Sequence, residues 1–214
     1  MPDPTRDFPI SSSATPRLIL ASGSAYRRTL LERLGLPFDV SVPDIDEQAA
    51  PGEAPQETAL RLAGEKARTV ARRSPGTLII GSDQVATLDG QQIGKPVTHA
   101  RALAQLQRMR GRQVVFHTAL CLHDGRTGAT VSEQFANVQT IVTFHTLDDA
   151  ALDAYLKIEQ PYDCAGSAKN EGLGIALIAS CESTDPTALT GLPLIALCGM
   201  LRTAGVAFFT QAPA

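Results

Sequence analysis

Residues 18–31 constrain the fold of this chain more than any other stretch. They begin with a short apolar run of strand length and turn through the small residues 22–24. They continue with Leu30, Leu31 and Leu34 at helical spacing. This order predicts a strand, a tight turn and a helix. Because the free N–H groups at a helix start and the helix dipole both favour an anion, such a turn is suited to binding phosphate.

Two arginines lie in the first turn of the predicted helix. Arg27 and Arg28 oppose the helix dipole there, which is unfavourable for the helix alone and favourable for an anionic ligand. Ser22 adds a hydroxyl at the turn. Taken alone, these residues leave two alternatives open: a phosphate site, or an ordinary strand–helix unit that carries two solvated arginines.

The rest of the chain predicts an α/β fold in a single domain over residues 17–210. Residues 1–16 are polar and rich in Pro and Ser, which predicts a disordered extension. Alternating or continuous apolar runs predict further strands at residues 38–42, 78–82, 113–123, 129–144 and 175–179. Helical spacing predicts helices at residues 57–73, 98–110, 147–158 and 192–202, the second of them capped by Thr98.

An acid follows the apolar run at 78–80. The run ends in Gly81 and Ser82, and Asp83 comes next. In α/β folds ligands bind beyond the carboxyl ends of strands, so an acid there is placed for chemistry or for metal binding. The alternative is a carboxylate that caps a helix or a turn.

The unusual polar residues form the inventory needed to hydrolyse a phosphoanhydride. Cations neutralise a triphosphate, one or two carboxylates hold a divalent metal, and a further acid orients or deprotonates water. The residues concerned are Ser22, Arg27, Arg28, Glu47, Lys66, Asp83 and Lys95. Whether they converge in space is a matter for the structure.

The net charge and the cysteines indicate which classes of partner and which location to expect. A net charge of −3 gives no general attraction to nucleic acid or to an anionic membrane, so we expect a small-molecule substrate and neither of those partners. The N-terminus has no apolar stretch of the signal-peptide kind. The four cysteines lack metal or redox spacing, which favours free thiols in the cytoplasm. The oligomeric state stays open, with a homodimer as one option.

Several runs together resemble the Maf family of nucleoside triphosphate pyrophosphatases, in order and over about residues 17 to 207. They are residues 18–28, 46–47, 65–67, 79–84, 94–96, 165–172 and 191–193. The resemblance implies an α/β fold of the inosine-triphosphatase type, with two lobes of a long mixed sheet around a nucleotide cleft. It also implies hydrolysis between the α and β phosphates with a divalent cation, Mg²⁺ or Mn²⁺.

The resemblance also implies roles for single residues. Asp83 matches the family's catalytic acid, which accepts a proton from water, and Glu47 matches the acid that helps Asp83 to place the metal. The phosphate-binding positions correspond to Ser22, Arg27, Lys66 and Lys95, with Arg28 beside them. The family's usual Pro is Ala25 here, which loosens the turn and leaves its polar groups in place.

Three positions bear on the substrate. Tyr26, Gln84 and Glu171 resemble the branch that acts on 7-methyl-GTP, whereas the dTTP and UTP branch tends to carry Arg, Thr and Gln. N7-methylation makes guanine cationic, which suits an aromatic face, and a carboxylate can accept from both N1–H and the amino group. The alternatives are a half-exposed Tyr26 and a solvated Glu171, a pyrophosphatase of other canonical or modified nucleotides, or a non-catalytic nucleotide-binding regulator.

Overall fold

The computed structural model of the protein describes residues 16–209. The predicted extension over residues 1–16 therefore lies almost wholly outside the described residues, as does the predicted domain end at residue 210. Within the described chain, no helix combines the length and the apolar character needed to cross a membrane.

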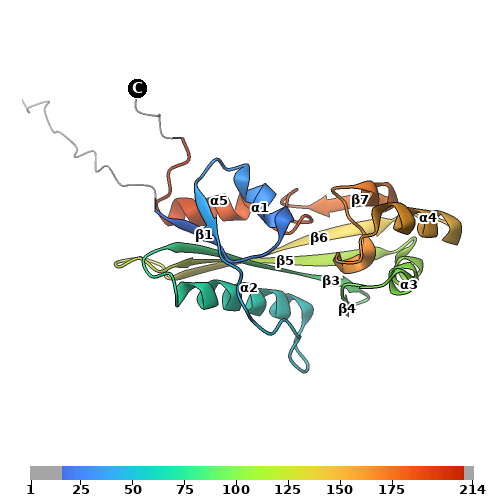
Figure 1. Cartoon of the computed structure of the whole chain (residues 1–214), viewed down its shortest axis with the longest axis horizontal. Coiled ribbons are helices and arrows are strands. Elements are labelled where there is room, and N and C mark those ends of the chain that lie inside the picture. The colour runs from blue at the N-terminus through green and yellow to red at the C-terminus, as the bar shows by residue number, and fades with distance from the viewer. Residues whose placement is uncertain (1–15, 210–214) are drawn as a thin grey trace, which may run out of the picture.

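A seven-stranded mixed sheet forms the centre of the molecule (Figure 1), in the order β2-β1-β3-β5-β6-β7 with β4 paired to β3. Its strands are β1 (Leu18–Leu20), β2 (Phe38–Val40), β3 (Leu78–Leu88), β4 (Gln91–Ile93), β5 (Gln113–Asp124), β6 (Glu133–Phe144) and β7 (Ile178–Ser183). Strands β1, β2 and the start of β3 are parallel, and the other pairs are antiparallel. The α/β fold with a long mixed sheet is confirmed.

Five helices cover the two faces of the sheet in the described chain. They are α1 (Ala25–Glu32), α2 (Pro55–Ala71), α3 (His99–Met109), α4 (Asp149–Glu159) and α5 (Leu194–Thr203), with 3-10 turns at Ala165–Ser167 and Leu173–Leu177. Helix α2 packs on one face, while α1 and α5 lie on the opposite side of the sheet from it (Figure 1). Helices α3 and α4 pack against the far end of the strands.

The alternation along β3 assigns its side chains to these layers. Ile79 and Val85 belong to the core beneath α2, whereas Ile80 and Ala86 belong to the cores beneath the other helices. Because successive strand residues point to opposite faces, Asp83 faces α2 and its neighbour faces the other way.

Gly81 permits the close approach of α2 to β3. A Cβ atom at residue 81 would stand 2.1 Å from the carbonyl oxygen of Ala63 in α2, a distance that no side chain can occupy. Only glycine therefore allows the helix to lie this close to the strand.

The open edge of β3 decides where a ligand can enter. On the side away from β5, β3 pairs with β1 over residues 78–80 and with β4 over residues 86–88. Within the described chain, residues 81–85 between these two pairings have no neighbouring strand on that side. The sheet therefore has a gap beside the middle of β3, although residues such as Ser82, Asp83 and Val85 remain buried there.

Several expectations about strands are wrong. Asp83 does not follow the end of a strand, because β3 continues to Leu88 and Asp83 lies in its middle. The strand predicted at residues 175–179 begins only at Ile178, since Ile175 lies in a 3-10 turn. Strand β4 was not predicted, and β6 begins at Glu133 rather than at residue 129.

Candidate active site

A cavity of about 760 Å³ opens at the gap in β3. Its walls come from the β1–α1 turn, the segment before α2, α2 itself, the middle of β3, the loop after β4, and the segments around residues 163–171 and 189–191. These segments are far apart in the sequence, and the sheet gathers them around one opening.

Lys66 joins two carboxylates in the cavity. Its Nζ lies 2.7 Å from Oδ1 of Asp83 and 2.7 Å from Oε1 of Glu47. The Lys66 and Asp83 side chains are only 6% and 11% exposed, whereas that of Glu47 is 58% exposed. A buried amine with two anionic partners is charge-compensated, which a lone buried ammonium would not be.

The local field holds Glu47 in its charged form. Desolvation acts to raise the pKa of Glu47, but the hydrogen bond from Lys66 and the charges of Lys66, Lys95 and Arg27 outweigh it. The pKa of Glu47 is therefore lowered, and its carboxylate is available as an oxygen ligand or hydrogen-bond acceptor.

Arg27 is fixed beside this cluster. Its Nε donates to the carbonyl oxygen of Gly191 at 2.8 Å, and one terminal nitrogen donates to Oγ of Ser22 at 3.3 Å. Desolvation lowers the pKa of Arg27, while Asp83 and Glu47 act against that shift. Guanidinium stays charged in proteins and has five N–H donors, so these two bonds leave donors for an anion.

Lys95 and Arg28 end in different places. Lys95 lines the cavity from the loop after β4. Arg28 does not line it: its side chain is 64% exposed and pairs with Glu32 one turn along α1, at 3.0 Å. The structure thus brings one arginine of the pair to the cavity. Arg28 lies outside the cavity lining, and its part in phosphate binding stays a prediction.

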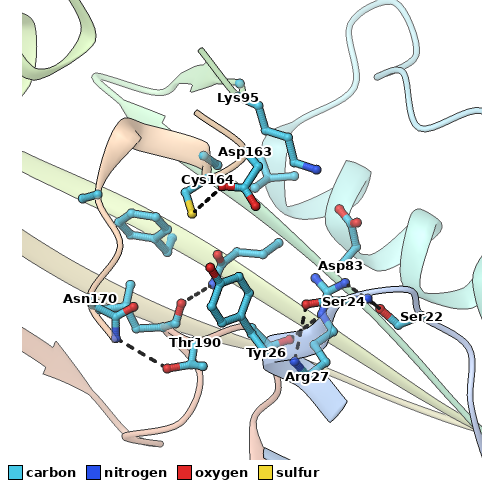
Figure 2. Close-up of a pocket in the computed structure, with 18 of the residues that line it drawn as sticks. Ser22, Ser24, Tyr26, Arg27, Asp83, Lys95, Asp163, Cys164, Asn170 and Thr190 are labelled. Carbon is cyan, nitrogen blue, oxygen red and sulfur yellow. Dashed lines mark hydrogen bonds between the residues drawn. The ribbon is translucent and has the colours of Figure 1, made fainter. Parts of the chain in front are cut away.

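Tyr26 (Figure 2) and Glu171 line the same cavity. Apolar side chains that include Phe116 and Phe144 line it as well. The pKa of Tyr26 is raised, first by desolvation and then by nearby Cys164, Asp163 and Glu171, against the opposing charge of Lys169. The hydroxyl of Tyr26 is therefore a neutral phenol at neutral pH.

Gln84 also lines the cavity, but its amide nitrogen is engaged within the protein. Nε2 donates to Oγ1 of Thr118 at 2.9 Å and lies 3.0 and 3.1 Å from the carbonyl oxygens of Leu189 and Ala188.

Sequence reasoning missed several lining residues. Asp163, Asn170 and Thr190 all face the cavity (Figure 2). The available signal was weak: Asp163 precedes a glycine-rich loop that carries Asn170, and loops of this kind often contact ligands. Lys169 of the same loop pairs with Glu159, at 2.9 Å.

The donors present fit a divalent cation that also binds the substrate. Mg²⁺ and Mn²⁺ prefer hard oxygen ligands, and the carboxylates of Glu47 and Asp83 supply them. The ammonium group of Lys66 lies between these two carboxylates. Over residues 16–209, no three or more His, Cys, Asp or Glu side chains gather as a complete metal site. An ion bound here would take its other ligands from phosphates and water, which is usual for Mg²⁺.

Comparisons with known proteins identify relatives of this chain. A 7-methyl-GTP pyrophosphatase from Ralstonia nicotianae is 67% identical over 187 residues, which is 87% of this chain and 95% of the relative. One from Cupriavidus metallidurans is 64% identical, over 94% of this chain and 99% of the relative.

A solved HAM1 protein from Coxiella burnetii aligns at 20% identity and a TM-score of 0.45, over 62% of this chain and 74% of its own. The family model described as Maf-like protein matches residues 17–204, nearly the whole described chain. The chain therefore belongs to the Maf family.

Proposed function

We propose that this chain hydrolyses 7-methyl-GTP to 7-methyl-GMP and diphosphate. The observation that carries the proposal is one cavity that contains the Asp83–Lys66–Glu47 cluster and, with it, Tyr26 and Glu171. Relatives that carry this activity in their names align with this chain over more than nine tenths of their own length.

The phosphate end would bind and activate the triphosphate. Arg27, Lys66 and Lys95 supply positive charge, and Ser22 a hydroxyl, where negative charge spreads in the transition state. Asp83 takes a proton from the attacking water, whose oxygen bonds to the α-phosphorus. The bond from that phosphorus to the α–β bridging oxygen breaks, and diphosphate leaves. Because Lys66 occupies Oδ1 of Asp83, Oδ2 is the atom assigned to accept the proton.

Mg²⁺ or Mn²⁺ belongs to this proposal. Glu47 and Asp83 would hold the ion, and when bound it would neutralise part of the phosphate charge. Before the ion binds, Lys66 keeps the carboxylates of Glu47 and Asp83 close to each other.

The other end would select the base. Tyr26 offers an aromatic face to the cationic ring of 7-methylguanine, and Glu171 can accept from N1–H and from the exocyclic amino group. The carboxylates of Asp163 and Glu171 line the same cavity and would attract a cationic base. A single catalytic domain over residues 17–210 and a cytoplasmic location complete the proposal; the latter draws on the four free cysteines.

A substrate panel tests the function. Purified protein with Mg²⁺ or Mn²⁺ is given 7-methyl-GTP, GTP, dTTP and UTP, and released diphosphate is measured. We expect the highest kcat/KM with 7-methyl-GTP. Release from dTTP or UTP with 7-methyl-GTP left intact would overturn the substrate assignment. Binding of nucleotide without any release would favour the non-catalytic regulator instead.

A further inference from the structure

The amide nitrogen of Gln84 is saturated by the protein itself. It has two N–H groups, and three acceptors lie within 3.1 Å of it: Oγ1 of Thr118 and the carbonyl oxygens of Ala188 and Leu189. Gln84 therefore has no amide hydrogen to offer to a base in the cavity. Its nitrogen instead holds the start of the segment 188–191, which we call the arginine loop.

The other end of the arginine loop holds Arg27. The carbonyl oxygen of Gly191 accepts from Nε of Arg27 at 2.8 Å. It also lies 2.9 Å from Oγ of Ser82, whose single hydroxyl hydrogen is shared with the carbonyl oxygen of Ala119 at 2.8 Å. Gly191 has a φ of 110°, which a residue with a side chain adopts only under strain. The conformation of the arginine loop, which directs this carbonyl at Arg27, therefore depends on glycine at residue 191 and on the side chains that bond to the loop.

Two of the side chains that bond to the arginine loop lie behind the cavity wall. Thr118 and Ser82 are fully buried, and neither of them lines the cavity. Thr118 Oγ1 accepts from Gln84 and donates to the carbonyl oxygen of Ala188 at 2.9 Å. A chain of hydrogen bonds thus runs from Gln84 and Thr118, through the arginine loop, to Arg27.

We propose that Gln84 is a positioning residue for the phosphate end of the site. Its bonds to the arginine loop fix the Gly191 carbonyl, and that carbonyl orients the guanidinium of Arg27. Gln84 then affects every ligand that carries phosphates, whatever its base. This inference rests on the proposed function only in assigning Arg27 to the phosphates.

Inorganic triphosphate, which has no base, provides the decisive probe. Its affinity is measured by calorimetry for the unaltered chain, for Gln84→Met and for Thr118→Val. Both substitutions keep the size of the side chain and remove the bonds to the loop. We expect both to weaken triphosphate binding roughly tenfold, because small misplacements of a binding group are costly. Thr118→Ser keeps the hydroxyl and should restore affinity.

Thr87→Val is the matched control. Thr87 is also buried on β3, but its hydroxyl donates to the carbonyl oxygen of Val115 on β5 and not to the arginine loop. We expect its triphosphate affinity to stay within about twofold of the unaltered chain, since an isolated hydroxyl bond contributes little to a distant site.

In turnover, Gln84→Met and Thr118→Val should lower kcat/KM for 7-methyl-GTP and GTP by the same factor.

Two results would overturn the inference. In one, Gln84→Met leaves triphosphate affinity unchanged but raises KM for 7-methyl-GTP relative to GTP, which would make Gln84 a base-reading residue. In the other, Thr118→Val binds triphosphate as the unaltered chain does while Gln84→Met does not. Triphosphate binding that follows the expected pattern in a chain without nucleotide turnover would defeat the proposed function and support the inference.

Discussion

At the scale of single residues, Lys66 determines how the carboxylates of the site are held. It lies 2.7 Å from both Asp83 and Glu47, so it keeps two like charges together before any ligand arrives. With Arg27 and Lys95 nearby, three positive charges face the two carboxylates at this end of the cavity. The surplus positive charge favours a polyanionic triphosphate, and a divalent cation that enters with it would offset more of its negative charge.

Asp83→Asn tests the proposed proton acceptor. Asparagine keeps an oxygen for Lys66, whereas truncation to Ala would remove that partner, a loss that costs about 3–5 kcal/mol for a buried ion pair. We expect turnover of 7-methyl-GTP to fall at least about a hundredfold, the usual contribution of a general base. The melting temperature and the nucleotide affinity should persist.

Asp39→Asn is the control, because Asp39 pairs with Arg17 at the surface and lies outside the cavity. Its turnover should match that of the unaltered chain. Unchanged diphosphate release from Asp83→Asn would remove Asp83 from the mechanism.

At this scale, the sequence predicts which types of side chain the site contains better than it predicts where each side chain points. Arg27 and Arg28 are equivalent as charges in one helical turn, but successive helical residues point about 100° apart, so only one can face a given cavity. The sequence singles out Asp83 because it follows an apolar run, although its place in the cavity lining comes from the gap between β1 and β4. That gap depends on where two other strands end, which no local pattern in β3 contains.

At the scale of elements, the irregular segment 43–54 before α2 carries Glu47 to Lys66. One arginine of α2 fastens it: Arg61 contacts both carboxylate oxygens of Glu53 at 2.6 and 2.8 Å and donates to the carbonyl oxygen of Gln48 at 3.0 Å. The residue next to Glu47 is thus tied directly to the helix that presents Lys66.

Arg61→Met should loosen this segment. We expect faster amide hydrogen exchange over residues 43–54, because the bidentate bonds and the bond to Gln48 are lost together. Arg68→Met is the matched control, since Arg68 lies on the same helix and forms a bidentate pair with Glu133 on β6. Exchange over residues 43–54 that is equal in the two variants would contradict the assigned role of Arg61.

The ion pair between Arg61 and Glu53 predicts that the stability of the fold depends on pH. Hydrogen bonds from Arg61 first, and from the backbone of Ala50, lower the pKa of Glu53 from 4.5 to about 2. A carboxylate with a lowered pKa stabilises the fold above its unfolded pKa and loses that effect as the pH falls towards its folded pKa. The pair therefore contributes fully above about pH 5, and its contribution declines between pH 4.5 and 2.

Denaturant unfolding of the unaltered chain and of Arg61→Met measures this dependence. The difference in unfolding free energy between them should be constant from pH 8 to pH 5 and should shrink below pH 4.5. A difference that stays the same down to pH 3 would show that Arg61 stabilises the segment through packing and not through Glu53.

At the scale of the whole molecule, most elements could be predicted, but not the enclosure that they form. Long periodic segments such as α2, α3, β5 and β6 follow from their own residues, and Thr98 caps α3 as predicted. The cavity instead results from strand order, from the unequal lengths of β1 and β3, and from α2 reaching β3 at Gly81. These are relations between distant segments, so only the resemblance to a family could anticipate them.

Because the cavity walls extend from Ser22 to Gly191, ligand binding should stabilise the entire fold. At a ligand concentration of about 100 times Kd, binding to the folded state alone adds about 2.7 kcal/mol. For a chain of this size that corresponds to a rise in Tm of roughly 5–10 °C. Thermal unfolding of Asp83→Asn with 7-methyl-GTP measures the rise without turnover.

The arginine pair makes this measurement specific to the proposed site. Adding Arg27→Met to Asp83→Asn should abolish most of the rise in Tm, because the guanidinium that faces the cavity is lost. Adding Arg28→Met should preserve it, because Arg28 pairs with Glu32 outside the cavity. Equal loss from both substitutions would mean that the nucleotide binds over the surface of α1 and not in the gap of the sheet, and the assignment of this cavity as the active site would then fail.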